Sequence, residues 1–324
     1  MPLHTDFLRL PYTPDLTESG VALALRSLAY SYEREGRSPY GRLRRMVANV
    51  AVELAFRRHL TQENVPFDVK ASTPFTDHER FDVVLKGHRC DLKSFLISHR
   101  EQIIGIRQNP AVLLDAPALV PSDSHAGDGH SYDDIYLFAF MNGLVAASQS
   151  DLQKAIAKKQ PHYLVHVPPM TWRRPLHWKP LGKLTLKSES AEVLTVEING
   201  QDEARKMKRR VVNIPPEVKT YVDDDPFYSI TSLRVHRVPE ARVGIRCEAI
   251  KDALIIQPHE WGNIWVYGMD IFMVGYATYE EMSQRSTLLQ AGSRTFQYER
   301  THVKNLALAV SKLKPIKRLL NSAQ

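Results

Sequence analysis

The chain has 324 residues, enough for one large or two medium domains, and its 43% hydrophobic and 24% charged residues are typical of a globular protein. Its 43 Lys and Arg residues against 36 Asp and Glu give a formal net charge of +7, which suits a polyanionic partner without requiring one. Neither a signal-peptide core nor an apolar run of membrane-spanning length is present, so the sequence predicts neither secretion nor a membrane span.

Two helices are predicted near the N-terminus. Leu16 to Glu35 is the first, ended by Gly36, and Arg42 to Leu60 is the second. Glu53 lies roughly 80° from the centre of the apolar face of the second helix. From that edge it can reach a site above a sheet, or it can pair with Arg57 one turn later. The apolar face consists of Leu43, Met46, Val47, Val50 and Leu54.

A first strand is predicted at Val65 to Val69, and a polar connection from Ala71 to Arg80 leads into a β-hairpin. The hairpin consists of the apolar runs Phe81 to Leu85 and Cys90 to Phe95, joined by a polar turn that contains Gly87.

The charges of this hairpin gather on one face. Side chains alternate along a strand, so Asp91 and Lys93 project together. An even-length loop is expected to pair Val84 with Asp91 and Asp82 with Lys93, which adds Asp82 to the same face.

Two carboxylates and an amine are costly to bury together, because the like charges repel and each loses hydration. A divalent cation reverses this balance, since Mg²⁺ binds one or two protein carboxylates together with water and substrate phosphate. A lysine beside the ion can position the attacking water and stabilise charge on the phosphorus. The alternative is a solvent-facing hairpin in which Asp82 and Lys93 form a cross-strand ion pair.

The order of Glu53 on a helix, then Asp82, then Asp91-Leu92-Lys93 resembles the PD-(D/E)xK nuclease superfamily, which has the restriction-endonuclease-like fold. The resemblance implies that Glu53, Asp82 and Asp91 bind Mg²⁺ (or Mn²⁺) and that Lys93 acts in phosphodiester hydrolysis. Two features depart from the pattern: Phe81 replaces the proline before Asp82, and the acid of the (D/E)xK element is aspartate rather than the commoner glutamate.

After the hairpin, Arg100 to Leu114 is a predicted packed segment. Asp115 to Tyr132 is rich in Pro, Ser, Asp, His and Gly and is interpreted as a long loop, a candidate flap beside the site. Asp133 to Met141 is a predicted buried strand that ends at Asn142-Gly143.

In relatives of this fold, a strand with the pattern D-I-x-x-x-G-Y-x-T-x-E-E soon follows. Here the pattern occurs at Asp270 to Glu281, which predicts an insertion into the core, from roughly Pro168 to Gly262. The insertion contains short β-rich runs between turns and is expected to form a sandwich-like or jelly-roll-like unit that serves either as a cover or dimerisation module, or as a sensor or target reader. The expected fold class is α/β: a restriction-endonuclease-like core with a mixed sheet flanked by helices (1–167 and 263–324) and an inserted β-rich domain (168–262). Its predicted strands are Lys183 to Leu186, Glu192 to Ile198, Arg210 to Ile214, Ser232 to Val238, Val243 to Cys247 and Ala253 to Ile256.

Three further segments are candidates for nucleic-acid binding. The first consists of Trp172, Arg173 and Arg174. Its aromatic ring can stack on bases while its cations follow the phosphates. The alternative is that the tryptophan anchors a domain junction. The second is a phosphate-contacting patch or a solvated hairpin, and contains Lys206, Lys208, Arg209 and Arg210. The third, Lys304 to Leu320, is a predicted basic amphipathic helix, interrupted at Pro315, that packs on DNA, on a partner or on the core.

The sequence contains no zinc-ligand spacing, no P-loop and no G-x-G-x-x-G, so zinc, ATP and Rossmann cofactor chemistry have no support. Cys90 and Cys247 are too few for a disulfide framework, which predicts a cytoplasmic protein.

The expected function is a Mg²⁺-dependent endonuclease acting on DNA, with RNA as another possible substrate, in restriction, phage defence or mobile-element processing. It could act as a homodimer or with partner proteins of such a system. The alternative is a non-catalytic nucleic-acid-binding or assembly subunit with a degenerate nuclease core.

Overall fold

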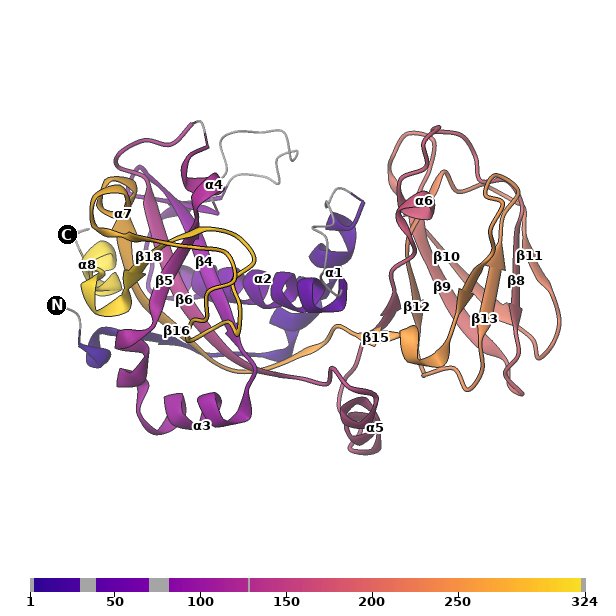
Figure 1. Ribbon diagram of the computed structural model, residues 1–324, viewed down its shortest axis with the longest axis horizontal. Coiled ribbons are helices and arrows are strands. Elements are labelled where there is room, and N and C mark those ends of the chain that lie inside the picture. Colours follow the sequence, from indigo (N-terminus) through magenta and orange to yellow (C-terminus); the bar gives the residue numbers. More distant parts are fainter. Residues whose placement is uncertain (1–2, 30–38, 70–81, 128, 322–324) are drawn as a thin grey trace. The chain divides into compact units, whose positions relative to one another are not determined.

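The computed structural model describes residues 3–29, 39–69, 82–127 and 129–321. It is a mixed α/β structure, with a curled six-stranded mixed sheet, helices and several antiparallel sheets (Figure 1). No helix within the described ranges is long and apolar enough to cross a membrane. The chain divides into two compact units, described separately below. Unit 1 comprises Met1–Gly20, Ala48–Leu144 and Val266–Gln324, and unit 2 comprises Val21–Val47 and Val145–Trp265.

The six-stranded sheet of unit 1 has the order β1-β16-β6-β4-β3-β2. Strands β4 and β6 pair in parallel, whereas β3 with β4, β2 with β3 and β1 with β16 pair antiparallel. Strands β6 and β16 are neighbours in this sheet, although most of unit 2 lies between them in the sequence. The strands are β1 (Leu8–Leu10), β2 (Phe67–Asp68), β3 (Val83–Leu85), β4 (His88–Ile97), β6 (Ile135–Val145) and β16 (Val266–Thr278).

Both predicted N-terminal helices are present, as α1 (Pro14–Ser27) and α2 (Pro39–Gln62). The buried face of α2 is rotated from the predicted one toward small residues, since Ala51 and Ala55 are buried while Val50 and Leu54 are only partly so. Residues 30–38, with the predicted end of the first helix, and 70–81, with the connection to the hairpin, lie outside the described residues.

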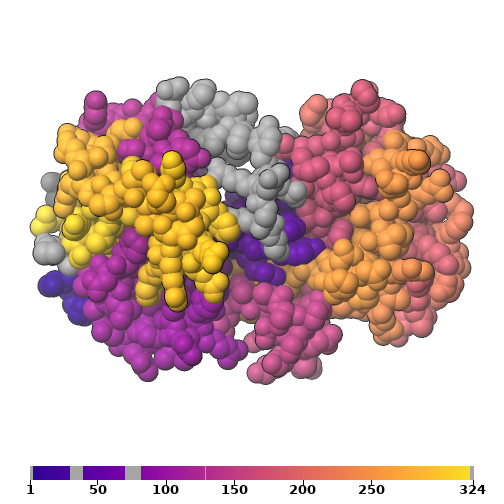
Figure 2. Space-filling view, in the orientation of Figure 1, coloured from indigo at the N-terminus to yellow at the C-terminus, as the bar shows by residue number. Residues whose placement is uncertain are grey.

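The two faces of the six-stranded sheet have different covers. On one face, Asn49 of α2 accepts a hydrogen bond from Ser94 of β4 (2.8 Å). On the other, Phe95 of β4 belongs to a core that it shares with α3, η2, β5 and β18. Residues 290–304 lie over this second face (Figure 2). There the ring of Tyr298 packs edge-on against Phe95, and the ring of Phe296 packs edge-on against Phe140.

The elements of this second layer are a three-stranded antiparallel sheet with the order β17-β18-β5 and several short helices. They are η1 (His4–Asp6), α3 (Arg100–Gln108), η2 (Pro110–Asp115), β5 (Pro117–Pro121), α4 (Ser122–His125), α7 (Tyr279–Arg285), β17 (Thr287–Leu289), β18 (Asn305–Ala309), η4 (Val310–Lys312) and α8 (Ile316–Asn321).

Three predictions for this unit are wrong. The segment 304–320 is not one amphipathic helix, because its first part forms β18 between β5 and β17. The segment 115–132 is not a structureless loop, since it contains β5 and α4. Strand β6 does not end at Asn142-Gly143: a Cβ at Gly143 would lie 3.0 Å from Leu96 and Val266, so glycine lets the strand continue between close neighbours.

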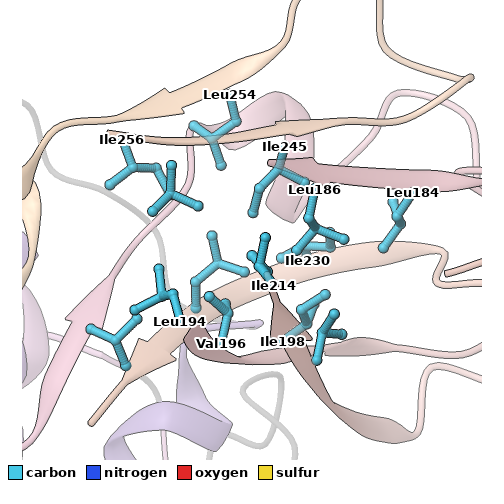
Figure 3. Close-up of a cluster of buried hydrophobic side chains, with 14 of the residues drawn as sticks. Leu184, Leu186, Leu194, Val196, Ile198, Ile214, Ile230, Ile245, Leu254 and Ile256 are labelled. Atoms are coloured by element: carbon cyan, nitrogen blue, oxygen red, sulfur yellow. The ribbon is translucent and has the colours of Figure 1, made fainter. Parts of the chain in front are cut away.

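Unit 2 contains two antiparallel sheets that share one hydrophobic core. Side chains of both sheets point toward one another in this core, among them Leu186 and Ile245 of one sheet and Val196, Ile198 and Ile230 of the other (Figure 3). The sheets have the orders β10-β9-β12-β7-β15 and β11-β8-β13-β14. Burial of each such side chain contributes about 1.5–3 kcal/mol to the stability of the unit.

Each of the six β-rich runs predicted between 168 and 262 overlaps an observed strand, while the compact unit is wider than that range. Its elements are α5 (Gln149–Ala157), β7 (Leu164–His166), α6 (Met170–Arg173), β8 (Leu184–Ser188), β9 (Leu194–Gln201), β10 (Met207–Ile214), β11 (Thr220–Val222), β12 (Ser229–Val235), β13 (Val243–Arg246), β14 (Leu254–Ile256), η3 (Pro258–Glu260) and β15 (Gly262–Asn263).

Two glycines of unit 2 give a matched test of this packing. A Cβ at Gly200 would lie 2.0 Å from the Ser229 carbonyl oxygen, whereas a Cβ at Gly244 would meet Ile255 Cδ1 at 3.4 Å, an ordinary contact. We expect Gly200→Ala to lower the free energy of unfolding by about 1–3 kcal/mol, because backbone must move to relieve the clash. Gly244→Ala should leave it unchanged or raise it slightly. Urea denaturation measures both, and equal effects would contradict the packing described.

Candidate active site

The hairpin of β3 and β4 turns at Lys86-Gly87. Leu85 is paired with His88 and Val83 with Cys90, so the register differs by two residues from the predicted one. Both turn residues have left-handed backbone angles (φ 52° and 81°), as a tight two-residue hairpin turn requires. Asp82 lies just outside this ladder, and its amide donates to the Cys90 carbonyl at 2.9 Å. A shift of two residues leaves each strand side chain on its predicted face, so Asp91 and Lys93 still project together.

Asp82 immediately precedes β3, and its carboxylate turns toward β4. Its Oδ2 accepts a hydrogen bond from the Leu92 amide at 2.6 Å. Burial raises the pKa of Asp82 to about 7, and the negative charges of Asp91 and Glu53 contribute to this rise. The Leu92 hydrogen bond and the Lys93 amine oppose it. When Asp82 is ionised, the Leu92 hydrogen bond and the Lys93 amine therefore do not fully offset the cost of its burial and its repulsion by a second carboxylate.

Asp91 and Lys93 lie two residues apart on the same face of β4. The Lys93 Nζ is 2.5 Å from Asp91 Oδ2, and both side chains are partly exposed, 19% for Lys93 and 23% for Asp91. The predicted alternative, a cross-strand pair between Lys93 and Asp82, is replaced by this same-strand pair.

Glu53 approaches the group from the other face of β4. It lies on α2 one turn after Asn49, whose partner Ser94 points away from Asp91 and Lys93 because side chains alternate along the strand. Glu53 forms the predicted alternative ion pair with Arg57, which also donates to the Asp82 carbonyl at 2.7 Å. Burial raises the pKa of Glu53, while the Arg57 cation opposes the rise.

A buried aromatic and imidazole network borders Asp91. Tyr136 of β6 is the parallel partner of Asp91, and its ring centroid lies 5.8 Å from Lys93 Nζ. The Tyr136 hydroxyl meets His125 Nδ1 at 3.1 Å, and His125 in turn stacks on Tyr279 with 4.1 Å between ring centroids. Burial and the Asp91 charge raise the pKa of Tyr136, so its hydroxyl keeps its proton at neutral pH. Tyr136 was not a predicted site residue, because only the β4–β6 register brings it here.

The first predicted nucleic-acid segment is largely buried in unit 2. Trp172 is 2% exposed and belongs to the shared core, and Arg173 is also 2% exposed, with its Nε donating to the Pro168 carbonyl. Arg174 donates to the Ala29 carbonyl at 3.2 Å. Trp172 and Arg173 thus offer no surface to a base or a phosphate in this structure, which agrees with the alternative of an anchoring tryptophan.

The second predicted segment lies on the edge strand β10 and the turn before it. Carboxylates pair with three of its four cations: Lys208 with Asp225 (2.6 Å), Arg209 with Glu197 (2.9 Å) and Arg210 with Asp224 (2.7 Å). Lys206 is exposed in the turn. The net positive charge of this surface is therefore much lower than the basic run alone suggests, which favours the alternative of a solvated hairpin.

The donor atoms of the candidate site fit a hard divalent cation. Within the described ranges, no group of three or more His, Cys, Asp or Glu side chains is arranged to hold a metal ion, so Glu53 does not complete a three-acid group with Asp82 and Asp91. A Mg²⁺ ion that keeps water and substrate phosphate as ligands needs only one or two carboxylates. Asp82 and Asp91 supply that number, and their repulsion would be relieved by a cation.

Comparisons of the chain with models of protein families, with curated protein sequences and with solved structures give no match.

Proposed function

We propose that the chain is a metal-dependent nuclease that hydrolyses DNA phosphodiester bonds, with a restriction-endonuclease-like core in unit 1 and a sandwich-like insertion in unit 2. The observation that carries the proposal is the contact of Asp91 with Lys93 on β4, next to a buried Asp82 carboxylate that accepts from the Leu92 amide and that the charges of Asp91 and Lys93 influence. The high pKa of Asp82 supports it, since a structural ion pair would be expected to lower that pKa.

In this proposal each residue has a separate task. Asp82 and Asp91 would hold Mg²⁺ or Mn²⁺, which supplies Lewis-acid activation of water and neutralises phosphate charge when bound. The Leu92 amide orients the Asp82 carboxylate. The Lys93 ammonium, which contacts Asp91 in this structure, would face the scissile phosphate and stabilise the developing negative charge.

A second candidate function is a non-catalytic nucleic-acid-binding or assembly subunit. The pairing of Glu53 with Arg57 and the lack of a three-acid group among the described side chains favour it, because a degenerate site would retain the hairpin without a full set of ligands.

Cleavage assays separate the two functions. Plasmid, linear duplex and single-stranded DNA are incubated with the full chain in Mg²⁺, Mn²⁺ or EDTA, and binding is measured in parallel. We expect metal-dependent cleavage that disappears in EDTA and in Asp91→Ala. DNA binding without cleavage in either metal would favour the subunit function.

A further inference from the structure

Four cationic side chains surround a surface pocket in unit 1, away from the carboxylates of the candidate site. The pocket has a volume of about 630 Å³ and is lined by residues of α7 and of the segment from η4 to α8. Its cations are Arg285, Lys312, Lys314 and Arg318, and its one carboxylate is Glu281. The segment predicted as one C-terminal helix instead forms β18, η4 and α8, and three of its basic residues, Lys312, Lys314 and Arg318, line this pocket.

The Glu281 carboxylate makes contacts within the fold, and its single negative charge does not offset the four cations of the pocket. Its carboxylate accepts a hydrogen bond from the Thr278 amide (3.1 Å), which caps α7, and it lies 3.1 Å from Lys314 Nζ and 3.6 Å from Arg285. Burial alone would raise the pKa of Glu281, but the Thr278 amide and Lys314 outweigh it and hold that pKa below its ordinary value. The carboxylate is thus ionised and already shared by two cations.

Lys312 and Arg318 are both exposed, and neither forms an ion pair with a carboxylate of the described residues. Between them the pocket is lined by Leu313, which is 3% exposed, and by Pro315. Several cations around one pocket suit a ligand that carries repeated negative charges better than a single small anion.

We infer that this pocket binds the phosphate backbone of a nucleic acid. The inference rests on the proposed function and adds to it a second, non-catalytic contact on the same unit. Phosphate oxygens accept hydrogen bonds from Lys and Arg at any sequence, so the pocket would hold the strand without reading its bases.

Helix α7 links the pocket to the candidate site. Tyr279 at its first turn stacks on His125, which is bonded to Tyr136, the partner of Asp91. Arg285 at its other end lines the pocket, and the helix between them is about 9 Å long. The same helix thus contributes one residue to the pocket and another to the aromatic network beside Asp91.

The test removes two charges from the pocket without touching the carboxylates. The double variant Lys312→Gln/Arg318→Gln is compared with the full parent chain and with Arg100→Gln/Arg300→Gln, which loses two exposed cations elsewhere in unit 1. Binding of a labelled DNA duplex is followed by fluorescence anisotropy in EDTA over a range of salt concentrations, with thermal melts to confirm folding.

We expect the slope of log affinity against log salt to decrease by about 1.8 in the pocket variant, if each cation contributes one phosphate contact, and to change little in the control. Equal slopes in parent and pocket variant, or an equal loss in the control, would overturn the inference. Inorganic phosphate distinguishes a small-anion site: if it raises the melting temperature of the parent alone while the DNA slopes remain equal, the pocket binds free phosphate and the inference fails.

Because the assay contains no divalent metal, its outcome is separate from that of the proposed function. If the parent never cleaves DNA but the pocket variant loses DNA binding, the pocket inference stands and the nuclease proposal fails. If the parent cleaves DNA and the pocket variant binds DNA normally, the nuclease proposal stands and the pocket inference fails.

Discussion

Replacing Asp91 or Lys93 with alanine should slow DNA cleavage by at least about 10²-fold while leaving unit 1 folded. Lys93→Ala should lower the maximal cleavage rate by about 10²–10³-fold, the usual effect of removing one charge-stabilising donor. Asp91→Ala should lower it by at least about 10³-fold, because it removes metal ligation worth several kcal/mol. Both side chains are partly exposed, so their truncation leaves no buried cavity.

Metal titration of the cleavage rate separates the two roles. Asp91→Ala should need much more Mg²⁺ for its remaining activity, whereas Lys93→Ala should reach a low plateau at the parent's Mg²⁺ concentration. Ser94→Ala is the matched control, since Ser94 lies on the same strand but bonds to Asn49 on the opposite face. A large loss of activity in Ser94→Ala, with Lys93→Ala near parental activity, would place the chemistry elsewhere.

The stability of the parent should fall as the pH rises from about 4 to about 7. The folded protein holds the Asp82 proton up to a pKa of about 7, whereas the unfolded chain loses it near the ordinary value of about 4. Between these values the folded state binds more protons, so each step up in pH favours the unfolded state; above about 7 the effect is complete. The shift corresponds to about 4 kcal/mol.

Asp82→Asn removes this dependence and keeps an oxygen for the Leu92 amide. We expect the variant to match the parent near pH 4 and to exceed its free energy of unfolding by up to about 4 kcal/mol at pH 8. Urea denaturation at several pH values measures the difference, and Mg²⁺ at pH 8 should narrow it, since the ion stabilises only the carboxylate. Parallel pH profiles for parent and variant would show that Asp82 ionises freely.

Local signals predicted the hairpin and the common face of its charges. Period-two alternation and the glycine turn are properties of a few adjacent residues, and they fix which side chains share a face in any register of the same parity. The register itself was missed, because Lys86 holds a left-handed angle that Asn or Asp more often occupies in such turns.

The partners of the site residues could not be predicted, because they depend on pairing across long sequence distances. Tyr136 reaches Asp91 only through the parallel register of β4 and β6. The carboxylates of Glu197 and Asp224 neutralise cations of β10 from a neighbouring strand and a later loop. In the sequence these cations form a basic run, because the carboxylates that pair with them lie elsewhere in the chain.

The sequence itself explains why the prediction of a single helix from Lys304 to Leu320 is wrong. Leu306, Leu308 and Val310 recur every second residue, which is a strand period, and this signal was outweighed by the cations around them. The pattern from Asp270 to Glu281 was predicted as a strand, and Asp270 to Thr278 lie in β16, whereas Tyr279 to Glu281 begin α7. Its Thr278 and Glu281 form the capping box that starts α7, so this part of the pattern has a structural role.

Binding of Mn²⁺, followed by electron paramagnetic resonance at pH 8 in the presence of a DNA duplex, shows whether Asp82 and Asp91 are metal ligands. We expect the parent to retain Mn²⁺, Asp91→Asn and Asp82→Asn to lose it, and Lys93→Ala to keep it. Equal Mn²⁺ retention in the parent and the two asparagine variants would contradict the assignment of Asp82 and Asp91 as metal ligands.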